Sequence, residues 1–86
     1  MKYFIFVFRA RSQATRLFQK IKNYARAQLV STPGYIYPEC SLSVKTDESA
    51  LRLAFSLISG ERLNTFIGAY YVNETENTVQ RINPNG

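Results

Sequence analysis

The sequence predicts an α+β domain in which one antiparallel sheet carries two helices on the same face. Short segments of aromatic and β-branched residues, typical of strands, alternate with two segments whose apolar residues recur at helical spacing. Their order is β-α-β-β-α-β, which is the ferredoxin-like arrangement. Because 86 residues are too few for two independent cores, we expect residues 1–86 to form a single domain, with residues 83–86 as a flexible tail.

The first strand is predicted at residues 2–9, a segment too short for a typical helix and rich in aromatic residues. Both of its faces are apolar, with Tyr3, Ile5 and Val7 on one side and Phe4, Phe6 and Phe8 on the other. A strand of this kind lies centrally in a sheet and is covered on both faces. Since both helices occupy one face, we expect a second copy of the chain to cover the other, which predicts a homodimer through the open sheet face.

A first amphipathic helix is predicted over about residues 13–25, with Ser12 as its N-cap. Residues 27–31 form the second strand. The turn at residues 32–34 ends this strand, since its proline lacks the amide hydrogen that a sheet ladder needs. A loop leads from this turn to Cys40.

The second half of the chain predicts a third strand at residues 41–45, where apolar and polar residues alternate. Asp47 is expected to cap a second helix, and Gly60 to end it as the residue just after its last turn. Two strands joined by a hairpin turn complete the chain, and the second of them is an addition to the ferredoxin-like order. They are predicted at residues 65–72 and 78–82.

The composition excludes several classes of chemistry. With one cysteine the chain cannot form an internal disulfide, and with no histidine it lacks the usual nucleophile–base pairs and the commonest zinc ligand. The acidic residues show no metal-loop spacing, so we expect no metal and no cofactor. These absences favour a carrier or binding domain over an enzyme with turnover.

The N-terminal apolar run ends at Arg9, after six residues, whereas a secretory signal needs about 7–15. No other run approaches the roughly 18 apolar residues that span a bilayer. We therefore expect a cytoplasmic protein without a membrane partner, in which a lone thiol stays reduced.

The net charge is +5. Every charged residue from Lys2 to Arg26 is basic, because the first acidic residue is Glu39. This asymmetry suits a phosphate-bearing partner, but without aromatic residues interleaved on that helix a solvated helix face explains it better. RNA binding on the sheet, with aromatic stacking, is one alternative function. A dimeric interaction domain without chemistry of its own is the other. The predicted third strand, residues 41–45, opposes RNA binding because it contains no aromatic residue.

Cys40 is the one candidate for a reactive residue. In the predicted topology the end of the first strand, the start of the first helix and the loop after the second strand share one rim of the sheet. Arg9, Arg11 and Ser12 would lie on that rim with Cys40, where guanidinium groups and helix amides favour an anion such as a thiolate or its sulfur adduct. The alternative is a buried structural thiol, and the neighbouring Glu39 opposes an anion by like-charge repulsion.

Three short segments resemble the Se/S carrier protein-like family of small bacterial domains. The similarity covers about residues 3–58 and rests on Phe8-Arg9-Ala10-Arg11-Ser12-Gln13-Ala14, Val30-Ser31-Thr32-Pro33 and Cys40-Ser41-Leu42-Ser43-Val44. The resemblance implies that Cys40 carries sulfur or selenium from a donor protein and that Thr32 and Pro33 form the family's turn. The chain departs from the family at Gly34, where arginine is usual, and at Ser41, where glycine is usual.

Overall fold

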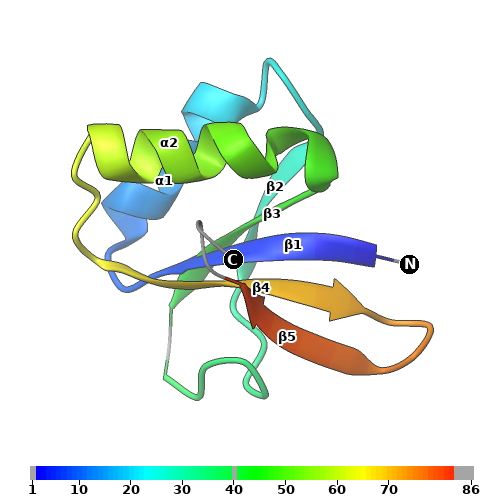
Figure 1. Cartoon of the computed structure of the whole chain (residues 1–86). Coiled ribbons are helices and arrows are strands. Elements are labelled where there is room, and N and C mark those ends of the chain that lie inside the picture. The colour runs from blue at the N-terminus through cyan, green and yellow to red at the C-terminus, as the bar shows by residue number, and fades with distance from the viewer. Residues whose placement is uncertain (1, 40, 83–86) are drawn as a thin grey trace.

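The structure is a computed structural model that describes residues 2–39 and 41–82. Its elements are β1 (Lys2–Phe8), α1 (Arg11–Ile21), β2 (Ala27–Ser31), β3 (Leu42–Thr46), the 3₁₀ turn η1 (Glu48–Ala50), α2 (Leu51–Gly60), β4 (Phe66–Asn73) and β5 (Thr78–Ile82). The strands form one antiparallel sheet in the order β2-β3-β1-β4-β5, and both helices lie on the same face of it (Figure 1). The predicted ferredoxin-like α+β fold is confirmed, with β5 as the extra strand. The predicted tail at residues 83–86 and Cys40 lie outside the described residues.

The main core lies between the sheet and the helices. Phe6 and Phe8 on β1 are fully buried there, and Leu17 of α1 and Ala54 of α2 pack into the same cluster. The ring of Phe6 meets the ring of Phe55 edge-on, with 5.3 Å between their centroids. Burial of one such side chain contributes about 1.5–3 kcal/mol, so the central position of β1 follows from its aromatic face.

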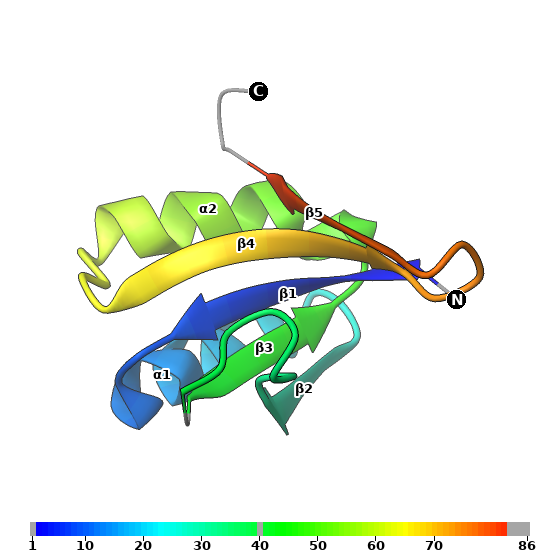
Figure 2. The same cartoon turned by 90° about the horizontal axis from the view of Figure 1, so that it is seen from below.

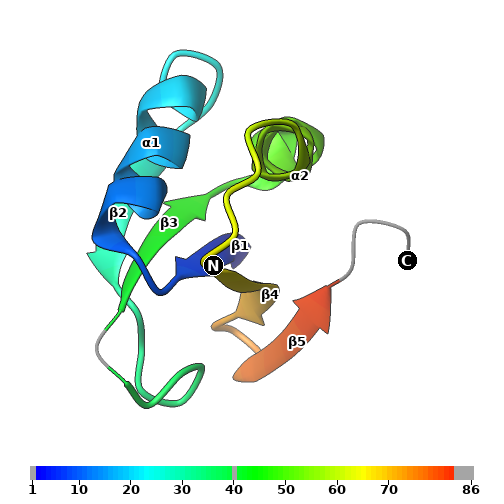
Figure 3. The same cartoon turned by 90° about the vertical axis from the view of Figure 1, so that its left-hand side faces the viewer.

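The opposite face of β1 is covered by the loop between β2 and β3, which we call the covering loop (residues 32–41, Cys40 excepted). Ile5 and Val7 are 1% and 0% exposed, and Ile36 and Tyr37 of the loop pack against them. Figures 2 and 3 show this loop on the side of the sheet away from both helices. The chain therefore buries this face of β1 with its own loop, which the sequence did not indicate. The homodimer inferred from that face stays a prediction.

The first helix differs from its predicted bounds at both ends. It begins at Arg11 with Ala10 in the N-cap position, so Ser12 lies within the first turn and is not the cap. The Ala10 amide donates to Thr65 Oγ1 at 3.2 Å. This bond orients the chain so that the helix begins earlier than the sequence predicts. At the other end, the amides of residues 24 and 25 both donate to the Ile21 carbonyl, which closes a turn and ends the helix.

The second helical segment is preceded by η1, which Asp47 caps as predicted by accepting a hydrogen bond from the Ser49 amide at 3.0 Å. Gly60, however, is the last residue of α2 and not the residue that follows it. Arg62 takes the left-handed conformation there, with φ of 52°, while the Leu63 amide donates back to the Ile58 carbonyl at 3.0 Å. This hydrogen-bond pattern is that of a Schellman motif, and it brings the apolar Leu63 into the core.

Candidate functional site

A hollow of about 450 Å³ opens at the end of β1 where α1 begins, and we call it the Arg9 hollow. Its walls come from the β1–α1 junction, the end of β2, the covering loop and the start of β3. They comprise Arg9, Arg11, Ser31, Thr32, Gly34, Tyr37, Pro38, Glu39, Ser41 and Leu42. The hollow therefore lies on the rim where the topology predicted that the site residues would meet.

The two arginines are positioned by hydrogen bonds between the start of α1 and the segment before β4. The Arg9 amide donates to the Thr65 carbonyl at 2.9 Å. Gln13 Oε1 in turn accepts hydrogen bonds from the Thr65 amide at 2.9 Å and from Thr65 Oγ1 at 2.6 Å. Sequence reasoning missed Gln13 and Thr65 as positioning residues, because they are 52 positions apart and no local pattern connects them.

A chain of hydroxyl groups fixes the two ends of the covering loop to each other. The Ser41 hydroxyl donates to Thr32 Oγ1 at 2.7 Å, and Thr32 Oγ1 also shares a hydrogen bond with the hydroxyl of Ser43, which is fully buried. The Thr32 amide donates to the Ser41 carbonyl at 3.1 Å. Both polar ends of the loop are thus satisfied internally, which holds the residue after Cys40 in place.

Ser41 takes the position where the resembled family has glycine. Its side chain supplies the hydroxyl that joins the loop ends. A glycine could not make this bond, so the substitution exchanges backbone freedom for a contact that orders the loop.

Gly34 takes the position where the family has arginine, and it lines the Arg9 hollow. A Cβ atom built there meets nothing within 4 Å, and φ is not positive. The backbone and the space around Gly34 therefore accept a side chain, and a cation placed here would face Arg9 and Arg11.

The balance of charge in the Arg9 hollow is positive. Arg9 and Arg11 are exposed, and Glu39 is the carboxylate among the residues that line the hollow. Tyr37 donates a hydrogen bond from its hydroxyl to Glu39 Oε2 at 3.0 Å. Within residues 2–39 and 41–82, ion pairs form at Glu61 alone, so neither arginine of the hollow is neutralised by a salt bridge.

The structure brings together most, but not all, of the predicted site residues. Arg9, Arg11, Thr32, Gly34 and Ser41 line one hollow. Ser12 is exposed in the first turn of α1 and does not line it. Pro33 does not line it either; its carbonyl accepts from the Ile36 and Tyr37 amides at 3.0 and 3.1 Å and so shapes the covering loop.

In the parts of the chain that the structure describes, no three His, Cys, Asp or Glu side chains come together in a way that could hold a metal ion. None of the described helices is both long enough and apolar enough to cross a membrane.

Comparison with known proteins found no family model, no curated protein and no solved structure that matches this chain. The resemblance to the Se/S carrier protein-like family therefore stays a prediction. Function has to be argued from the chain's own residues.

Proposed function

We propose that this chain is a carrier of sulfur or selenium that holds its cargo on Cys40. One observation supports the proposal above all others. Glu39 and Ser41, the two chain neighbours of Cys40, line the same hollow as Arg9 and Arg11. Guanidinium groups that lack a carboxylate partner attract an anion, and both a thiolate and a persulfide are anions at neutral pH.

The carrier step needs a nucleophilic sulfur and a donor protein, and it needs no histidine. The Cys40 thiolate attacks the terminal sulfur of a donor persulfide, R–S–SH. A bond forms between Cys40 Sγ and that sulfur, the S–S bond of the donor breaks, and the donor leaves as the thiolate R–S⁻. Selenium transfers from R–S–SeH in the same way. Arg9 and Arg11 then stabilise the negative charge of the adduct.

This role requires a compartment in which the thiol stays reduced, so we place the protein in the cytoplasm. The chain transfers a group between two partner proteins and performs no turnover on its own. A sulfur or selenium donor protein is accordingly its first expected partner.

The test is the rate at which iodoacetamide alkylates Cys40, followed by mass spectrometry from about pH 5 to pH 10. Cys40 is the single cysteine, so the added mass on the peptide that contains it reports on this thiol. We expect a midpoint well below the ordinary thiol value of about 8.5. Arg9→Gln/Arg11→Gln should raise the midpoint by about 0.5–1 pH unit, because exposed charges act partly through water. Gly34→Arg should lower it.

Arg52→Gln/Arg62→Gln is the matched control, since it also removes two exposed cations and neither of them lines the Arg9 hollow. It should leave the midpoint unchanged. A wild-type midpoint at or above about 8.5 would make Cys40 a structural thiol and overturn the carrier proposal. If the midpoint is low, incubation with a persulfide donor should add one sulfur atom to the wild type and none to Cys40→Ser.

A further inference from the structure

A second hollow, of about 780 Å³, lies at the opposite end of β1 from the Arg9 hollow. Four basic residues line it, drawn from the start of β1, the turn after α1 and the end of β3. They are Lys2, Lys22, Arg26 and Lys45, which we call the basic band. Three of the four are exposed, and Lys45 is half-buried with its Nζ 4.2 Å from the centre of the Tyr3 ring.

No salt bridge compensates the charge of the basic band within the described part of the chain. The ion pairs there are those of Arg16 and Lys20 with Glu61, and none includes a residue of the band. Asp47 is the carboxylate among the residues that line the hollow, so positive charge remains in excess there. Burial, together with the neighbouring Tyr35 hydroxyl, raises the pKa of Tyr3 to about 12, so this phenol adds no negative charge at neutral pH.

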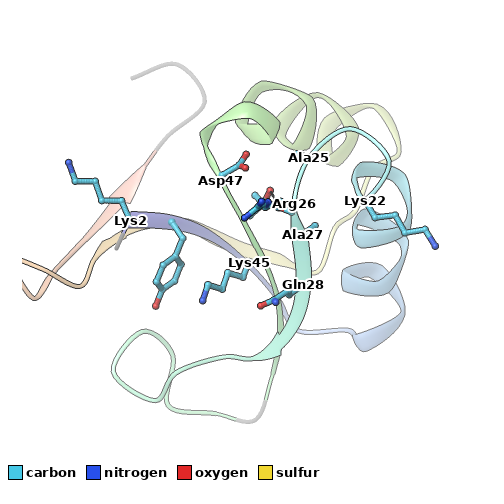
Figure 4. A pocket seen from close by; sticks show the side chains of 10 residues that line it. Lys2, Lys22, Ala25, Arg26, Ala27, Gln28, Lys45 and Asp47 are labelled. Carbon is cyan, nitrogen blue, oxygen red and sulfur yellow. Dashed lines mark hydrogen bonds between the residues drawn. The ribbon is translucent and has the colours of Figure 1, made fainter.

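The shape of the basic band suits an extended anion better than a single phosphate. Figure 4 shows Lys2 and Lys22 at opposite sides of the hollow, with their side chains pointing away from each other, and Arg26 between them. Lys45 and Gln28 project together toward one side. Cations spread in this way follow a chain of charges, whereas a single phosphate is held by groups that converge on it.

Exposed aromatic rings accompany the band. Tyr24 lies between Lys22 and Arg26 in the sequence and is 75% exposed, and Tyr35, beside Tyr3, is 69% exposed. Exposed rings next to cations provide stacking surfaces for unpaired bases, and the exposed amide of Gln28 can hydrogen-bond their edges. A segment that inserts into a bilayer surface would instead carry Leu, Phe or Trp side chains on one face beside the cations. The exposed large hydrophobic residues of the described chain are Tyr24, Tyr35 and Val79.

We propose that the basic band binds single-stranded nucleic acid, with Lys2, Lys22, Arg26 and Lys45 on successive phosphates and Tyr24 stacked on a base. This site differs from the sheet-surface mode of RNA binding, because the covering loop occupies the middle of the sheet. It is independent of Cys40 and of the carrier function. The bound nucleic acid would pass around the end of the sheet where β1 begins and β3 ends.

The test is fluorescence anisotropy of a labelled single-stranded RNA of about 12 nucleotides, measured at several salt concentrations. Two double variants are compared. One is Lys22→Gln/Arg26→Gln and the other is Arg52→Gln/Arg62→Gln. Both lower the net charge by the same amount, since each removes two exposed cations, but only the first pair belongs to the band. We expect the first variant to flatten the plot of log K against log salt by about 1.4, because each lost phosphate contact contributes about 0.7. The second should bind as the wild type does.

Tyr24→Ala should weaken binding about fivefold or more if a base stacks on the ring. Cys40→Ser should bind normally, so that failure of this proposal and failure of the carrier proposal are distinguishable. Equal losses in the two double variants would mean attraction by net charge without a site, and would overturn the proposal. Binding to vesicles rich in phosphatidylserine without binding to RNA, or tighter binding to the duplex than to the single strand, would also overturn it.

Discussion

At the scale of single residues, the end of α2 separates what a residue type favours from what the fold requires. Glycine is the usual residue in the left-handed position after a helix, and Gly60 therefore predicts the end of this one. The fold instead continues the helix through Gly60 and places Arg62 at φ of 52°. It does so because Leu63, one residue later, is buried in the core and its amide closes the motif on Ile58.

Replacing Arg62 by glycine and replacing Gly60 by alanine should each stabilise the protein. The left-handed conformation costs an L-residue about 1–2 kcal/mol, so Arg62→Gly should raise the free energy of unfolding by about 0.5–1 kcal/mol after the entropy of the added glycine is subtracted. Gly60→Ala should add up to about 1 kcal/mol, because a Cβ at position 60 meets nothing within 4 Å. Urea unfolding of the single and double variants measures both. A destabilised Arg62→Gly would contradict the assignment of strain to Arg62.

At the scale of elements, α1 and α2 are joined on their outer side by Glu61. It follows the last residue of α2 and forms ion pairs with Arg16 and Lys20, which lie one turn apart on α1. The hydrogen bond from Arg16 holds the pKa of the Glu61 carboxyl below its ordinary value, and the charge of Lys20 acts in the same direction. The side chains of Arg16 and Lys20 are 61% and 52% exposed, so solvent screens the contribution.

The lowered pKa of Glu61 predicts a pH dependence of stability. The unfolded carboxyl binds its proton at a higher pH than the folded one, so the stabilisation is complete above the ordinary pKa and is lost as the pH falls through the folded value. Glu61→Gln should therefore lose less stability than the wild type between about pH 7 and pH 3. Glu76→Gln, an exposed position in the β4–β5 turn, is the control and should keep the wild-type slope. Equal slopes for all three proteins would show that the ion pair contributes nothing.

At the scale of the whole molecule, the chain is compact. Its radius of gyration is 11.7 Å, close to the roughly 12 Å expected for a compact domain of this length. Helices cover one face of the sheet and the covering loop covers the middle of the other. Among the strand residues of the open face, Val79 on β5 still exposes a large apolar side chain, at 39%.

The predicted homodimer is therefore expected to form at the β4–β5 end of the open face. Val79→Glu would place a charge within the contact and should convert a dimer into a monomer in sedimentation velocity. Thr78→Glu, at the exposed neighbouring position whose side chain projects from the other face of β5, is the matched control. A wild-type chain that sediments as a monomer at concentrations of about 100 μM would refute the homodimer, since a stable interface binds far more tightly.

The sequence by itself determined the order of the elements, the central place of β1 and the rim that carries Arg9, Arg11 and the turn beside Cys40. It could do so because hydrophobic periodicity is local and the ferredoxin-like order fixes which strand ends meet. The tertiary structure alone decided that the covering loop buries Ile5 and Val7, and that Gln13 and Thr65 hold the start of α1. Both sets of contacts, the apolar packing and the hydrogen bonds, join segments far apart in the chain and form only once the sheet has brought those segments together.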